Sequence, residues 1–184
     1  VSGGTTSGIP GEVGIAAEHL DNQKCKAFAL IGYLPKKLPS DAKTSPHYGR
    51  LLRTDANQFS AKELISYWID LLLAGVEPSK VLVLGINGGR IADLEYRLAL
   101  ALGAVVGLVQ NSGRAAAGLP ADPDWKNHRG IVELAEDGKI VWAFVHQHQP
   151  VQLSTEQIDS LAPQAHEYYR QKRIEQKNTS DKAM

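Results

Sequence analysis

Two glycine-rich segments hold the residues best suited to chemistry in this chain, and that chemistry is anion binding. The first is VSGGTTSGIPG at residues 1–11, and the second is VLVLGINGGRIADLE at residues 81–95. Each lies where an apolar run of strand length gives way to a helical pattern. A helix start offers unpaired backbone N–H groups and the positive end of the helix dipole, and glycine lets a ligand come close because it has no Cβ. The two loops together predict a ligand that carries phosphate.

Each predicted loop contributes its own kind of donor. The second loop offers backbone N–H groups, with the Asn87 amide suited to a base or a ribose. A third loop follows another apolar run and contains Arg114, the cation best placed to balance a phosphate. The candidate ligand-binding residues are therefore Gly3, Gly4, Thr5, Thr6, Ser7, Gly8, Asn87, Gly88, Gly89, Ser112, Gly113 and Arg114, with Tyr33 and Arg90 as further contacts.

Glu95 is the only candidate catalytic residue, and its role is open. It lies one and a half turns into the helix predicted after the second loop, where it could accept a bond from a ribose hydroxyl or transfer a proton. Alternatively it pairs with Arg90 and Arg97 on an exposed helix face. His146 and His148 would share one face of a strand, where they could ligate a metal. We interpret them as surface histidines instead, and no metal site is predicted.

Composition narrows the class of protein. The chain has 184 residues, a formal net charge of zero and an apolar fraction of 43%. These values fit one domain with a tail, and the missing basic excess argues against duplex nucleic acid as a partner. No apolar run reaches the roughly 18 residues of a membrane span, so no direct membrane insertion is expected. A single cysteine, Cys25, fits the reducing cytoplasm.

The elements that must position these residues alternate between strand and helix. Buried strands are predicted at residues 27–33, 81–86 and 104–109, and helices at 10–20, 60–75 and 90–102. Ser60 and Glu63 form a capping box, and the helix that follows would bury Leu64, Ile65, Trp68, Ile69 and Leu72. This order predicts an α/β fold, a Rossmann-like open parallel sheet with helices on both faces.

The remaining segments are predicted less sharply. Residues 33–58 would form a long surface connection able to close over a ligand, and residues 110–125 another loop. Residues 131–145 are ambiguous, because Asp137-Gly138 favours a hairpin whereas IVELA could begin a helix. The first residues resemble the end of a strand, so a first strand and helix of the fold are expected before Val1. We divide the chain into a domain at 1–150 and a C-terminal helix with a frayed tail at 151–184.

The main functional expectation concerns convergence of loops. Loops that follow parallel strands leave the same edge of the sheet, where ligands bind. The segments expected to gather along that rim are Gly3–Gly8, Tyr33–Pro35, Ile86–Arg90 and Asn111–Arg114.

The residues also resemble a known superfamily. NGGRIADLE is similar to the PGGxGTxxE motif of the Lonely Guy phosphoribohydrolases of the SLOG superfamily, with Gly88 and Gly89 at the paired glycines and Glu95 at the catalytic glutamate. The order of SGGTTSGIPG, GYLPKKLP, YWIDLLLAG, SGRAA and DPDW resembles the prokaryotic TRPM-like branch of SLOG, called LSDAT, over about residues 1–145. EQIDSLAPQAHEYYRQKR resembles the start of a ryanodine-receptor-type repeat.

This resemblance implies a cytoplasmic signalling domain that senses a nucleotide or a nucleotide-derived ligand, with ADP-ribose-like molecules as the leading guess. It implies no other cofactor, and its output would pass to an attached effector domain or through a homo-oligomer. The alternative is a Lonely Guy-like phosphoribohydrolase, which cleaves the N-glycosidic bond of a nucleoside monophosphate with Glu95. The chain has Ile91-Ala92 where that motif has Gly-Thr, which favours the binding domain.

Overall fold

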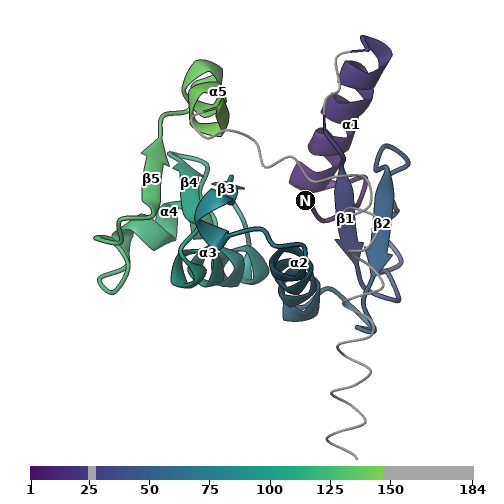
Figure 1. Ribbon diagram of the computed structural model, residues 1–184, viewed down its shortest axis with the longest axis horizontal. Helices are drawn as coiled ribbons and strands as arrows, with labels where there is room; N and C mark the ends of the chain where they lie inside the picture. Colours follow the sequence, from purple (N-terminus) through teal and green to yellow (C-terminus); the bar gives the residue numbers. More distant parts are fainter. Residues whose placement is uncertain (25–27, 147–184) are drawn as a thin grey trace, which may run out of the picture.

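The protein has an α/β fold with parallel strands and flanking helices, as the sequence predicts (Figure 1). The computed structural model describes residues 1–24 and 28–146. A first sheet pairs β1 (Ile31–Leu34) with β2 (Arg50–Arg53) in parallel. Ser2 adds a single parallel bridge to Gly32, on the other side of β1.

The second sheet contains the remaining three strands. They are β3 (Leu82–Gly85), β4 (Val105–Val109) and β5 (Ile131–Leu134), all parallel and in the order β3-β4-β5. Within the described residues the strands thus form two sheets, where one open sheet was expected. In Figure 1, β1 and β2 run down the page and β5 runs up toward α5, so the carboxyl ends of the two sheets open on different sides.

Helix α1 (Gly8–Asn22) covers the first sheet. Ala17 on the helix packs with Leu30 and Tyr48 in a small apolar cluster. The hydroxyl of Tyr48 also donates to the carbonyl of Pro10, at 2.9 Å. This helix is therefore held by the segment that links β1 to β2.

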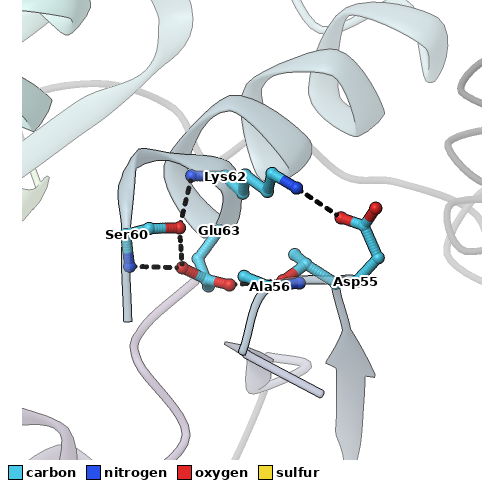
Figure 2. Close-up of polar contacts among 6 residues, drawn as sticks. Asp55, Ala56, Ser60, Lys62 and Glu63 are labelled. Carbon is cyan, nitrogen blue, oxygen red and sulfur yellow. Dashed lines mark hydrogen bonds and ion pairs between the residues drawn. The ribbon is translucent and has the colours of Figure 1, made fainter. Parts of the chain in front are cut away.

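Helix α2 (Ala61–Leu73) begins with the predicted capping box, which is confirmed (Figure 2). The Ser60 hydroxyl accepts a bond from the N–H of Lys62 at 3.2 Å, and the Glu63 carboxylate accepts one from the N–H of Ser60 at 2.8 Å. Glu63 also accepts from the hydroxyl of Thr54, which directly follows β2. The cap therefore joins the start of α2 to the end of the first sheet.

The buried face of α2 differs from the predicted apolar stripe. Leu64 and Trp68 are buried as expected, but Ile65 and Leu72 are 43% and 46% exposed. The helix turns polar and aromatic side chains inward instead, namely Glu63, Ser66, Tyr67 and Asp70. Asp70 accepts a bond from the Tyr33 hydroxyl of β1, and Tyr67 donates to Glu95 of α3, so apolar periodicity alone does not locate this face.

A single large core runs from the first sheet to the second through α2. Ile31 and Tyr33 of β1 join Leu64 and Trp68 of α2 in the same buried cluster as Val106 of β4. Figure 1 shows α2 between the two sheets. This helix is therefore the structural bridge of the described chain.

Three helices accompany the second sheet. Helix α3 (Arg90–Leu102) has the bounds that the sequence predicts and ends at Gly103, whose φ of 95° is the left-handed stop that favours glycine. Helix α4 (Arg114–Ala121) forms where a loop was expected, and that prediction was wrong. Its run of three alanines is a strong helix former, which outweighs the turn signal of the neighbouring glycines.

The segment of residues 131–145 is neither the expected hairpin nor a helix from its start. It forms the parallel strand β5 and then α5 (Gly138–His146). The carboxylate of Asp137 accepts a bond from the N–H of Lys139 at 2.7 Å, which caps the new helix. His146 therefore ends a helix and does not lie on a strand, while His148 lies outside the described residues.

The expected surface connection at residues 33–58 contains an unpredicted strand, β2. Its short sequence, RLLR, has charged ends and two leucines, too few for a periodic signal. A short 3-10 turn, η1 (Pro78–Lys80), precedes β3. Across residues 1–24 and 28–146, no helix combines the length and apolar character needed to cross a bilayer. The C-terminal helix expected at 151–184 lies outside the described residues.

Candidate functional site

The second and third predicted loops meet at the ends of two neighbouring strands. The Asn87 N–H donates to the Ser112 hydroxyl at 2.9 Å. In return, the N–H groups of Ala115 and Ala116 donate to the carbonyls of Gly88 and Asn87, at 3.2 and 2.8 Å. The loop after β3 is thus hydrogen-bonded to the first turn of α4, and Asn87, Gly88, Ser112 and Arg114 belong to one site.

Gly88 is required by this arrangement. Its φ of 93° lies in the left-handed region, and Asn87 beside it has a φ of 57°. A Cβ at Gly88 would lie 2.7 Å from the Cβ of Ala92 and 3.0 Å from the hydroxyl oxygen of Tyr96. A side chain therefore cannot fit at this position without displacing α3.

Arg114 lies against Gly89, at the start of α3. A Cβ built on Gly89 would be 3.2 Å from a guanidinium nitrogen of Arg114. Gly89 is the N-cap of α3, and among the described residues no side chain caps this helix. The first-turn N–H groups of an α-helix have no partner within the helix, and the guanidinium of Arg114 lies beside them at Gly89. An anion is the chemical group that matches both.

The start of α4 is a weaker anion site than the start of α3. Two of its first N–H groups, those of Ala115 and Ala116, already donate to the loop after β3. Gly113 has a φ of 87° and Arg114 a φ of 49°, which turns the chain sharply into α4. This turn carries the Arg114 side chain, while α3 supplies the unpaired backbone donors.

The first glycine loop lies in the first sheet, apart from this site. Its backbone is paired with the β1–β2 connection, since the Thr6 N–H donates to the Lys43 carbonyl at 2.9 Å and the Gly4 carbonyl accepts from Ser45 at 3.0 Å. A Cβ at Gly4 would lie 2.9 Å from a methyl carbon of Leu51. These contacts give the glycine a packing role, and the loop leaves a different sheet from Gly88 and Gly89.

The other members of the first group are also accounted for within the first sheet. Thr5 is buried and bridges to Thr44, and a Cβ at Gly3 would lie 3.0 Å from the ring of Pro10. Tyr33 is buried and donates to the carboxylate of Asp70 on α2. The exposed members of the loop are Thr6, Ser7 and Gly8.

Glu95 faces α2, and among the described residues it forms no ion pair with an arginine. Its carboxylate accepts a bond from the Tyr67 hydroxyl at 2.8 Å. Burial raises the pKa of Glu95, and the Tyr67 bond and the positive charge of the Val1 amino group oppose that rise. Arg97 pairs instead with Asp93 at 3.0 Å and with Asp122 at 2.9 Å.

The side chain of Tyr96, the neighbour of Glu95, packs against the loop that follows β3. Its ring would meet a Cβ at Gly85, and its hydroxyl would meet one at Gly88. Burial, together with the negative charges of Glu95 and Asp93, raises the pKa of Tyr96 to about 12. Tyr96 stays protonated at neutral pH, and burial makes its aromatic body part of the core.

A groove beside α4 is a feature that the sequence prediction missed. It has a volume of about 320 Å³, with Leu108 of β4 and Ala116 and Ala117 of α4 among its apolar lining. Gln110, which directly follows β4, and Glu133, which lies on β5, supply polar groups. One sequence feature points to this groove, namely the alanine run at residues 115–117, which keeps the wall of α4 free of large side chains.

Comparison with known proteins adds no assignment. No model of a protein family matches the chain, and no curated protein matches it. Among the described residues, no group of three or more His, Cys, Asp or Glu side chains is placed to hold a metal ion.

Proposed function

We propose that this chain is a binding domain for a nucleotide or a nucleotide-derived signal, and that a phosphate of the ligand sits at the start of α3. The observation that carries the proposal is the Arg114 guanidinium against Gly89, at a helix N-terminus with no side-chain cap among the described residues. The resemblance to SLOG proteins alone points to ADP-ribose-like ligands, whereas the groove beside α4 argues for a different base.

Three contributions would add at this phosphate. The N–H groups of the first turn of α3 donate to the oxygens, and the helix dipole adds about 0.3–1 kcal/mol. Arg114 can form charge-assisted, bidentate hydrogen bonds, which are stronger than bonds between neutral groups. Gly88 and Gly89 present no side chain that would keep the phosphate away from the backbone.

The test is thermal denaturation of the full chain with a panel of nucleotides, nucleosides and cyclic nucleotides. A ligand that binds only the folded state raises the melting temperature by mass action. We expect 5′-phosphorylated ligands to raise it more than their nucleosides, and Arg114→Ala to weaken their affinity about tenfold or more. Arg129→Ala, a change of an exposed arginine before β5, is the matched control and should respond like the wild type. Equal responses of both variants would contradict the proposal.

One observation favours the phosphoribohydrolase as a second candidate. Burial raises the pKa of Glu95, and an upward shift is the direction that suits a carboxyl group acting as a general acid. In that function Glu95 would act on the glycosidic bond while Arg114 holds the phosphate.

Product analysis separates the two candidates. The protein would be incubated with nucleoside monophosphates and the mixture assayed for free base and ribose phosphate. Release of base that Glu95→Gln abolishes supports the hydrolase, whereas ligand binding without release supports the sensor. A sensor would pass its signal to an attached effector domain or a second copy, which we propose on the resemblance alone.

A further inference from the structure

The groove beside α4 lies on the same face of the second sheet as α3 and α4. Leu108 pairs with Glu133 in register, so the two side chains share that face on adjacent strands. Leu108 is fully buried, and Ala116 and Ala117 line the groove from α4. The volume of about 320 Å³ falls in the range of ligand pockets, roughly 300–1,000 Å³. Small apolar walls beside a polar edge suit a flat ring.

The polar edge of the groove has a defined order of donors and acceptors. The Gln110 side-chain amide donates to a carboxylate oxygen of Glu133 across 3.4 Å, which is a long bond. The amide has a second N–H, and the carboxylate has further lone pairs. Side by side they present one donor followed by two acceptors.

We propose that this groove binds a guanine base, with Glu133 and Gln110 pairing to its Watson–Crick edge. That edge presents one acceptor, O6, followed by two donors, N1–H and the 2-amino group, which is the complement of the order in the groove. The carboxylate of Glu133 would accept both donors, and the Gln110 amide would donate to O6. The flat ring would rest against the exposed Ala117 of α4, with the buried Leu108 and Ala116 closing the floor of the groove.

The same edge disfavours the other common bases. Adenine has an amino group and an unprotonated N1, so its lone pair would face the carboxylate. Cytosine presents one donor followed by two acceptors, so its acceptors would face the carboxylate. Uracil presents a single donor between two acceptors, so one acceptor would face the carboxylate. A carboxylate oxygen that faces a lone pair of the base, where guanine offers an N–H donor, is left without a partner on the ligand, and that loss gives such an edge its selectivity.

This inference rests on the proposed function, because it names the base of the same nucleotide. The groove includes Asn111, and its neighbour Ser112 accepts the hydrogen bond from Asn87 of the phosphate loop. The base site and the phosphate site therefore follow the ends of adjacent strands. A guanine nucleotide would reach from one to the other across the turn at Ser112–Arg114.

Calorimetric titration of the full chain with matched nucleosides and nucleotides tests the inference. We expect guanosine 5′-monophosphate to bind about tenfold or more tightly than adenosine 5′-monophosphate. Inosine 5′-monophosphate, which lacks the 2-amino group, should fall between them. Guanosine should also bind more tightly than adenosine, since the groove acts without the phosphate.

Glu133→Gln provides the decisive variant. Glu133 is exposed, so the change should leave the fold intact, and it replaces one acceptor of the carboxylate by a donor. We expect it to abolish the preference for guanine, while Glu136→Gln, the removal of an exposed charge in the next turn, leaves the preference unchanged.

The outcomes separate the two proposals. Equal affinity for guanine and adenine nucleotides that still depends on Arg114 would overturn the base assignment and leave the phosphate site standing. A guanine preference that survives in Glu133→Gln would also overturn the assignment. No binding of any nucleotide would overturn both.

Discussion

At Gly89 the absence of a side chain leaves room for the guanidinium of Arg114, which would lie 3.2 Å from a Cβ built there. Position 4 is a glycine for a different reason, because a Cβ there would collide with the side chain of Leu51. The two glycines look alike in sequence. What distinguishes them is a neighbour far away in the chain, which no local pattern specifies.

Glu95 should make stability depend on pH. A carboxyl group whose pKa is raised in the folded state stabilises that state most below its unfolded pKa, about 4.3 for glutamate, and loses this contribution as the pH rises through the folded pKa. Glu95→Gln removes the titration and keeps an oxygen that can accept from Tyr67. The free energy of unfolding of the variant, measured in urea from pH 4 to 8, should rise relative to that of the wild type once the pH passes the unfolded pKa of about 4.3. A constant difference would contradict a raised pKa.

At the scale of elements, α2 connects the two halves of the described chain through polar contacts. Its cap binds Thr54 after β2, Asp70 accepts from Tyr33 of β1, and Tyr67 donates to Glu95 of α3. A helix placed this way needs a fixed start, because a shift of one residue would break all three contacts.

Loss of the cap should therefore be measurable as stability. Ser60→Ala removes the hydroxyl that accepts from the Lys62 N–H, and we expect it to lower the free energy of unfolding by about 0.5–2 kcal/mol. Denaturant unfolding checks the value. Ser79→Ala, at an exposed position in η1, serves as the control and should change stability by less than about 0.5 kcal/mol. Equal effects of the two changes would argue against the capping role.

The contact between α5 and the second sheet can be tested at a single glycine. A Cβ at Gly107 of β4 would lie 2.6 Å from the ring of Phe144 and 2.8 Å from a methyl carbon of Leu134. Gly107→Ala should lower the free energy of unfolding by about 1–3 kcal/mol through overpacking. Gly118→Ala, in α4 with open space around it, should instead stabilise by roughly 0.5–1 kcal/mol. A neutral Gly107→Ala would show that Phe144 does not rest on the sheet.

At the scale of the whole molecule, the sequence predicted the α/β class, α3 to the residue, and the capping box of α2. These features depend on local signals such as apolar periodicity, caps and terminal glycines. It missed β2 and α4, where short segments carry weak or mixed signals. It expected all loops on one rim because topology rules assume one sheet, and the described strands form two.

The candidate site was predicted in part for the same reason. Gly88, Gly89 and Arg114 follow adjacent parallel strands, so their proximity follows from topology, and the structure brings them together. The first glycine loop satisfied the same local pattern but belongs to the other sheet. Gln110 and Glu133 could not be foreseen, because their pairing depends on the register of β4 and β5.

The most direct measurement is the change in backbone amide resonances on titration of isotopically labelled protein with guanosine 5′-monophosphate. A phosphate at the start of α3 should shift the amides of Gly89, Arg90 and Ile91 most strongly, and Arg114→Ala should reduce those shifts. The amides of Gly3 to Gly8 should stay in place. Shifts centred on residues 3–8, or none at residues 89–91, would contradict the account.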